Sequence, residues 1–237
     1  MAIAKPMVVD LEKWKPKTEL GRKVKNREII DLSEILDSGK RILEPEIVDA
    51  LLPNLSTELV EVGQSKGKFG GGKGSIWKQT QKKTSEGTSI KFSAFAVVGN
   101  KDGYIGVAFA GSGETVPARE KAIRSAKLNI IGVRRGCGSW ACGCGTPHSI
   151  PFEASGKCGS VKVMLMPAPR GTGLKAEKKT SMLLNFAGVK DVYTYTQGQT
   201  ATKLNFLKAC FEALKNLSKI KVNPEFAKKA GIVGDEK

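Results

Sequence analysis

The stretch FSAFAVVGNKDGYIGVAFAG, residues 92–111, decides the fold of the first half of the chain. Phe92, Ala94 and Ala96 alternate with residues of the opposite face, a period of two that is typical of a half-buried strand. The Asn-Lys-Asp-Gly that follows, residues 100–103, is typical of a tight hairpin turn. We therefore expect two antiparallel strands joined by this turn.

The flanking segments extend this hairpin into a small domain. A strand is expected before it, in IWKQTQKKT at residues 76–84, and a helix after it, in TVPAREKAIRSAKLNII at residues 115–131. Pro117 lies in the first helical turn, where a backbone N–H has no partner to lose, and the apolar residues of this segment recur on one face. The sequence predicts a β-β-β-α unit at residues 76–135.

A second set of patterns predicts another small unit at residues 148–220. The expected elements are strands at 148–154 (HSIPFEA) and 160–166 (SVKVMLM), a helix at 177–188, a strand at 191–196 and a helix at 202–217. The order is β-β-α-β-α. Together the two units predict an α+β protein of two small domains.

Three further segments complete the expected organisation. Residues 1–75 form an N-terminal extension, in which EPEIVDALLP at 44–53 predicts a short helix and SKGKFGGGKGS at 65–75 a flexible segment. Residues 136–147 form a cysteine-rich linker, and residues 221–237 a C-terminal tail.

Composition points to the kind of partner. The chain of 237 residues carries a formal net charge of +16, and such an excess favours a polyanion, above all nucleic acid. A basic protein that is merely soluble is the alternative. We expect no membrane anchor and no secretory signal, because no apolar run approaches the roughly 18 residues of a membrane span. Five cysteines without a secretory signal favour reduced thiols over a disulfide framework.

Several long motifs occur here in the order of a known family. FSAFAVVGNKDGYIGVAFAG, KCGSVKVMLMPAPRGTGL and LLNFAGVKDVYTYTQGQTAT resemble the S-five family of small-subunit ribosomal proteins. RRGCGSW and KWKPKTELGRKV resemble its archaeal and eukaryotic branch, and the cysteine-rich loop resembles archaeal members. The Gly/Lys-rich segment and AGSGET at 110–115 depart from the family's pattern.

The resemblance implies a double-stranded-RNA-binding-like fold for the unit at residues 76–135. It also implies a structural, non-enzymatic protein of the cytoplasmic ribosome. It would bind small-subunit rRNA near the mRNA entry site, lie beside proteins of the S-three, S-four and S-eight families, and support decoding accuracy. A free-standing RNA-binding regulator or chaperone is the alternative.

Basic and small residues that suit phosphate contacts mark the expected RNA-binding surface. They are Lys66, Lys68, Lys73, Lys82, Lys83, Thr84, Ser85, Gly87, Arg134, Arg135 and Trp140.

The loop PAPRGTG, residues 167–173, could cradle a phosphate on its backbone amides. The family's C-terminal fold is shared with small-molecule kinases that use a Pro- and Gly-rich ATP loop, but the Ser-Ser-Ala continuation of that loop is missing here. The resemblance instead implies a protein interface with the S-four neighbour, formed by Arg170, Gly171, Thr172 and Gly173.

The segment CGSWACGCGTPH, residues 137–148, predicts either a structural zinc site or a reduced loop packed on RNA. Cys137, Cys142 and Cys144 are the expected thiolate ligands. The fourth ligand would be His148, which closes a short loop, rather than Cys158. The only histidine, His148, has no partner in the sequence that would make it a general base, so no catalysis is expected.

Overall fold

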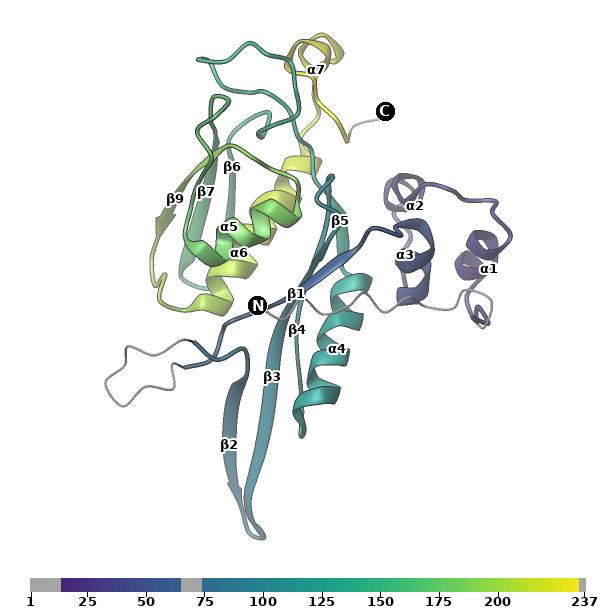
Figure 1. Ribbon diagram of the computed structural model, residues 1–237, viewed down its shortest axis with the longest axis vertical. Coiled ribbons are helices and arrows are strands. Elements are labelled where there is room, and N and C mark those ends of the chain that lie inside the picture. The colour runs from purple at the N-terminus through teal and green to yellow at the C-terminus, as the bar shows by residue number, and fades with distance from the viewer. Residues whose placement is uncertain (1–13, 65–73, 235–237) are drawn as a thin grey trace. The chain divides into compact units, whose positions relative to one another are not determined.

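The computed structural model describes residues 14–64 and 74–234, which form two compact units (Figure 1). Unit 1 comprises the chain up to Val98 together with Gly106–Ile130, and unit 2 comprises Gly99–Ile105 and the chain from Ile131 onward. None of the helices in the described ranges is long and apolar enough to cross a membrane.

Unit 1 opens with three short helices, α1 (Glu19–Lys25), α2 (Leu32–Asp37) and α3 (Pro45–Leu51). The helix predicted in residues 44–53 is confirmed as α3. The Glu44 carboxylate accepts hydrogen bonds from Trp14 Nε1 at 3.0 Å and from the Thr18 backbone N–H at 2.7 Å. These bonds join the start of α3 to the chain before α1, so this part of the extension is folded.

A five-stranded sheet follows, with strands β1 (Ser56–Val60), β2 (Lys78–Thr84), β3 (Gly87–Gly99), β4 (Tyr104–Ser112) and β5 (Ile130–Gly132). Its order is β1-β3-β4-β5, and β2 pairs with β3 in antiparallel register. The predicted β-β-β-α order is confirmed by β2, β3, β4 and α4 (Thr115–Leu128). The sequence patterns did not predict β1 and β5.

The helix α4 ends earlier than predicted and packs closely on β4. Asn129, the residue after the helix, donates its side-chain amide to the Val107 carbonyl of β4 at 3.0 Å, and the chain then turns into β5. Gly106 makes the close packing possible, because a Cβ there would lie 2.2 Å from the carbonyl oxygen of Ala126 in α4.

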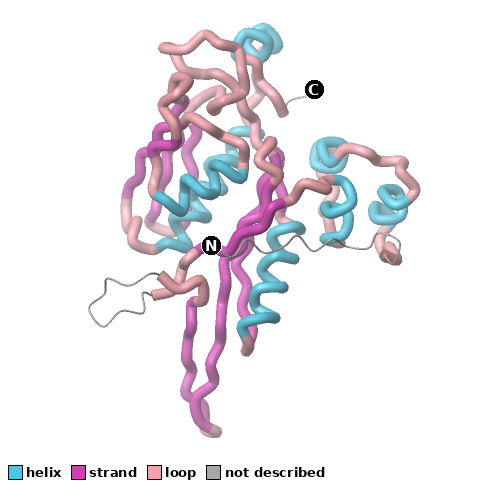
Figure 2. Tube along the Cα trace, in the orientation of Figure 1, coloured by secondary structure: helices cyan, strands magenta, loops and turns pink. Residues whose placement is uncertain are grey.

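The strand β3 differs along its length from the half-buried pattern expected. All five residues from Ala94 to Val98 are buried, so both faces of this half are covered. The other half forms a hairpin with β2 that extends away from the sheet as a two-stranded ribbon (Figure 2). Every residue of β2 is exposed. The hairpin tip pairs Thr84 with Gly87, whose φ of 124° explains the glycine.

Unit 2 contains a four-stranded sheet of β6 (Ala154–Cys158), β7 (Val161–Pro167), β8 (Leu174–Lys175) and β9 (Val192–Gln197), in the order β6-β7-β9-β8. Only the β8–β9 pair is parallel. The helices are α5 (Lys178–Phe186), α6 (Lys203–Lys219) and α7 (Pro224–Ala230). The core lies between β6, β7 and α6, where Gly156 lets the backbone of α6 approach the sheet.

The strand predicted at residues 148–154 is wrong. This segment contributes only an isolated bridge between Ser149 and Gly136, and the strand begins at Ala154. Pro151 interrupts the segment because proline has no N–H to donate to a sheet ladder. The short strand β8 and the helix α7, which lies in the expected C-terminal tail, were not predicted.

Candidate functional site

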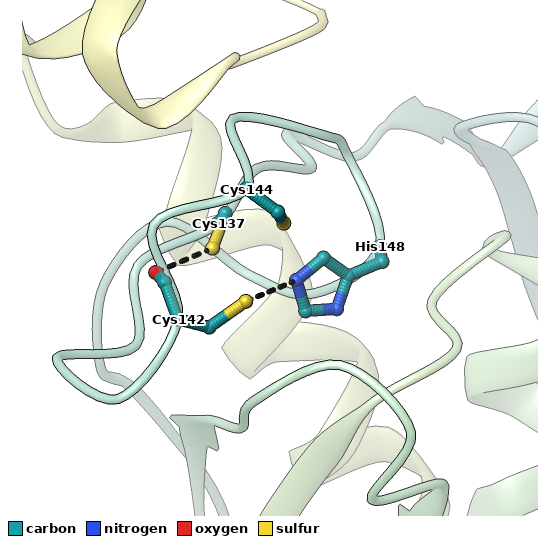
Figure 3. A group of neighbouring side chains, drawn as sticks. All are labelled: Cys137, Cys142, Cys144 and His148. Carbon is teal, nitrogen blue, oxygen red and sulfur yellow. Dashed lines mark hydrogen bonds between the residues drawn. The ribbon is translucent and has the colours of Figure 1, made fainter.

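Four predicted ligand residues come together in unit 2. The sulfurs of Cys137, Cys142 and Cys144 and a ring nitrogen of His148 all lie within 4.8 Å of one another, and Figure 3 shows the four side chains turned toward one another. Cys142 Sγ lies 3.9 Å from His148 Nε2. Zinc bonds of about 2.3 Å to sulfur and about 2.0 Å to nitrogen place a sulfur and a nitrogen about 3.5 Å apart in a tetrahedral site. The group is therefore close to the geometry that zinc requires.

The alternative fourth ligand, Cys158, is not a member of this group. It lies at the end of β6, and its sulfur is 4.0 Å from Asn205 Oδ1 on α6. The structure therefore brings together the set with His148 and leaves Cys158 in the sheet.

Backbone contacts within unit 2 hold the cysteine-rich segment. Cys137 N donates to the Ala230 carbonyl at the end of α7 at 2.8 Å, and Gly136 and Ser149 form the isolated bridge. A Cβ on Gly138 would lie 1.9 Å from the carbonyl oxygen of Pro151, so the chain needs glycine at this close approach. These contacts hold the backbone at both ends of the segment.

His148 is oriented by a residue that sequence reasoning missed. Its Nδ1 lies 2.8 Å from Asp191 Oδ2, and both side chains are 7% exposed. Asp191 directly precedes β9, 43 residues away from His148 in the sequence, where it resembles an ordinary polar turn residue. A carboxylate bound to one ring nitrogen of a histidine, with the other nitrogen facing a metal, is typical of metal sites.

The cysteines differ in acidity. Hydrogen bonds from the side chain and backbone of Thr146 lower the pKa of the Cys144 thiol to about 6. Burial raises the pKa of Cys137, whose thiol donates to the Cys142 carbonyl at 3.0 Å. Burial also raises the pKa of Cys210 to about 12, in keeping with its predicted apolar packing on α6.

The loop predicted as a protein interface lies beside the cysteine group. Arg170 and Gly171 are exposed, and together with Arg135, His148 and Lys190 they line a cavity of about 500 Å³. The cavity carries both signs of charge, because Asp191 also lines it and Arg135 is paired with Asp102.

The predicted RNA-binding residues occupy different places. Lys82, Lys83, Thr84, Ser85 and Gly87 lie exposed at the tip of the β2–β3 hairpin. Lys66, Lys68 and Lys73 lie outside the described residues. That these residues contact RNA stays a prediction.

The last three predicted RNA-binding residues lie in unit 2. Trp140 is 99% exposed. Arg134 Nη1 donates to the carbonyls of Leu217 and Ile220. Arg135 is buried, and its guanidinium is paired with Asp102 at 2.6 Å, an arrangement that favours a structural role.

Comparison with known proteins finds relatives along nearly the whole chain. Residues 76–134 match the model described as Ribosomal protein S5, N-terminal domain, and residues 156–230 match that of Ribosomal protein S5, C-terminal domain. The chain is 49% identical over 224 residues to small ribosomal subunit protein uS5 of Nanoarchaeum equitans, an alignment that covers 94% of this chain and 96% of the relative. It is 46% identical over 227 residues to the protein of the same name of Methanocaldococcus jannaschii, with 96% and 98% covered.

These matches define the class as a ribosomal protein with two α+β domains. The chain belongs to the ribosomal protein S5 family, and the resemblance to its archaeal members is confirmed. It is a structural, non-enzymatic component of the small subunit of the cytoplasmic ribosome, where it binds rRNA and other ribosomal proteins.

Proposed function

We propose that the protein lies near the mRNA entry site of the small subunit and supports decoding accuracy, beside proteins of the S-three, S-four and S-eight families. The observation that carries the RNA-binding part is the β2–β3 hairpin, which exposes Lys82 and Lys83 at its tip. The neighbouring partners and the site on the subunit follow from the family resemblance. The loop at 170–173, in which Arg170 and Gly171 are exposed, suits a contact with a protein neighbour.

Charge reversal at the hairpin tip tests the RNA contact. A Lys82→Glu/Lys83→Glu variant should bind small-subunit rRNA more weakly while staying folded. Two exposed cations that would displace counterions from the RNA phosphates are replaced by anions, which the phosphates repel. The matched control is Lys208→Glu/Lys215→Glu, the same charge change on exposed positions of α6. Filter retention across a salt series measures both. Equal binding of the two variants would remove the hairpin tip from the contact surface.

The regulator or chaperone hypothesis makes a different prediction about where the protein is found. A structural ribosomal protein should co-sediment with small subunits at low salt and leave no substantial free pool. A large free pool bound to other RNAs would favour the regulator.

We also propose that Cys137, Cys142, Cys144 and His148 bind a structural zinc ion. The support is the gathering of three sulfurs and one ring nitrogen within 4.8 Å, a donor set that zinc prefers. Bound zinc would supply the local stability that a glycine-rich loop without an apolar core lacks.

Elemental analysis tests this zinc site. Protein purified without chelator should carry about one equivalent of zinc, as expected for a single closed site. Cys142→Ser should lose the metal, and Cys158→Ser, a change outside the group, should keep it. Zinc-free protein in which the thiols of Cys137, Cys142 and Cys144 titrate freely in the folded state would favour the other interpretation, a reduced loop packed on RNA.

A further inference from the structure

We propose that Asp191 couples the zinc site to the loop at residues 170–173, so that metal binding orders this loop for its neighbour. The inference rests on the zinc site proposed above and adds a positioning residue and a consequence of metal binding. Every residue involved belongs to unit 2.

The first half of the coupling is the contact between Asp191 and His148. Asp191 Oδ2 lies 2.8 Å from His148 Nδ1, while His148 Nε2 faces Cys142 Sγ. An ionised carboxylate accepts hydrogen bonds only, so it selects the tautomer with the proton on Nδ1 and leaves the lone pair of Nε2 for the metal. With a metal bound at Nε2, the Nδ1–H group would be more acidic and would donate a stronger hydrogen bond to Asp191.

The second half is the contact between Asp191 and the loop. The other carboxylate oxygen, Oδ1, accepts a hydrogen bond from Gly173 N at 2.8 Å. At the other end of the loop, Ala168 N donates to Ser149 Oγ at 3.2 Å, and this hydroxyl donates to the Asp191 carbonyl at 2.5 Å. Both ends of the loop are therefore tied to the residue that holds the zinc ligand.

The two glycines of this loop have little packing to hold them. Gly171 and Gly173 adopt φ values of 88° and 73°, and a Cβ on either would meet no atom within 4 Å. A loop of glycines in open space keeps one conformation only where hydrogen bonds hold it. The bond from Gly173 N to the Asp191 carboxylate is such a restraint, beside the bond from Val192 N to the Gly173 carbonyl. Zinc would make the Gly173–Asp191 bond more persistent, because it would fix His148 and, through it, the orientation of the Asp191 carboxylate.

The isosteric change Asp191→Asn tests the coupling in the full chain. An amide has one acceptor and one donor end, so it cannot accept from both Gly173 N and His148 Nδ1. Zinc affinity, measured by competition with a chromophoric chelator, should fall about 10- to 100-fold, as for other partners of metal-bound histidines. The control is Glu212→Gln, the same chemical change on α6, which should leave zinc affinity unchanged.

Hydrogen exchange supplies the readout of the loop. In the wild-type chain, adding zinc to the metal-free reduced protein should slow exchange of the Gly173 amide, and Asp191→Asn should abolish this difference. The amide of Val163, in the β7–β9 ladder, serves as internal standard and should not respond.

The variant His148→Cys separates metal binding from coupling. Four cysteines still form a zinc site, but a thiolate cannot donate to Asp191. The variant should bind zinc and lose the zinc-dependent protection of Gly173. Protection that persists in this variant, or unchanged affinity and exchange in Asp191→Asn, overturns the coupling and leaves the zinc site standing. Failure of the wild-type chain to bind zinc overturns both proposals.

Discussion

Loss of one partner of the ion pair between Lys127 and Asp49 should strongly destabilise unit 1. Lys127 Nζ on α4 lies 2.6 Å from Asp49 Oδ2 on α3, and the two side chains are only 11% and 14% exposed. The pair joins the N-terminal helices to the domain that follows them. Removing one partner leaves the other charge nearly buried without compensation, which typically costs about 3–5 kcal/mol.

The single changes should therefore be costly and the double change mild. Lys127→Met and Asp49→Leu should each reduce the free energy of unfolding by about 3 kcal/mol, the low end of that range, because some exposure remains. The double variant should lie within about 1 kcal/mol of the wild type, since no charge is then left unpaired. At an m-value of about 1–3 kcal/mol/M, each single change shifts the urea midpoint by about 1–3 M.

Tryptophan fluorescence can follow this transition. Trp14 is 9% exposed and donates to Glu44 at the start of α3, whereas Trp140 in unit 2 is 99% exposed and should change little on unfolding. If the double variant loses as much free energy of unfolding as the two single variants together, the reasoning that the charges depend on each other is refuted.

Other regions of the chain give further expectations. Gly156→Ala should destabilise unit 2 by about 1–3 kcal/mol, because its Cβ would lie 2.2 Å from the backbone of α6. Urea unfolding followed by circular dichroism measures this loss. The control is Gly143→Ala, at an open position, which should cost far less. Burial acts to raise the pKa of Glu44, but hydrogen bonds from two backbone N–H groups outweigh it and hold the pKa below its ordinary value of 4.5. The resulting stabilisation is present above pH 4.5 and is lost as the pH falls through the lower pKa that Glu44 has in the folded protein. In the wild type, acid should therefore change Trp14 fluorescence before the chain unfolds, and Glu44→Gln should not show this early change. Cys210 should resist iodoacetamide in the folded protein at pH 8, since burial suppresses its thiolate; rapid labelling detected by mass spectrometry would contradict its packing.

Local patterns in the sequence were enough to predict most elements of both units. The period of two around Phe92, the Asn-Lys-Asp-Gly turn and the apolar face of α4 each depend on residues close together in the chain. The three cysteines and His148 also lie within one short segment, so the sequence alone offered two interpretations, a zinc site or a reduced loop packed on RNA. Such signals survive without tertiary context because helix and strand periodicity is a property of neighbouring residues.

Tertiary structure decided the features that depend on residues far apart. The strands β1 and β5 form only because β3 and β4 offer them an edge, and residues 148–154 form no strand because Pro151 interrupts the backbone ladder. The choice between His148 and Cys158 as fourth ligand depends on how the chain folds back after the cysteine-rich segment. Asp191 acquires its place only when β9 brings it to His148, because a hydrogen bond between residues 43 positions apart leaves no periodic signal in the sequence.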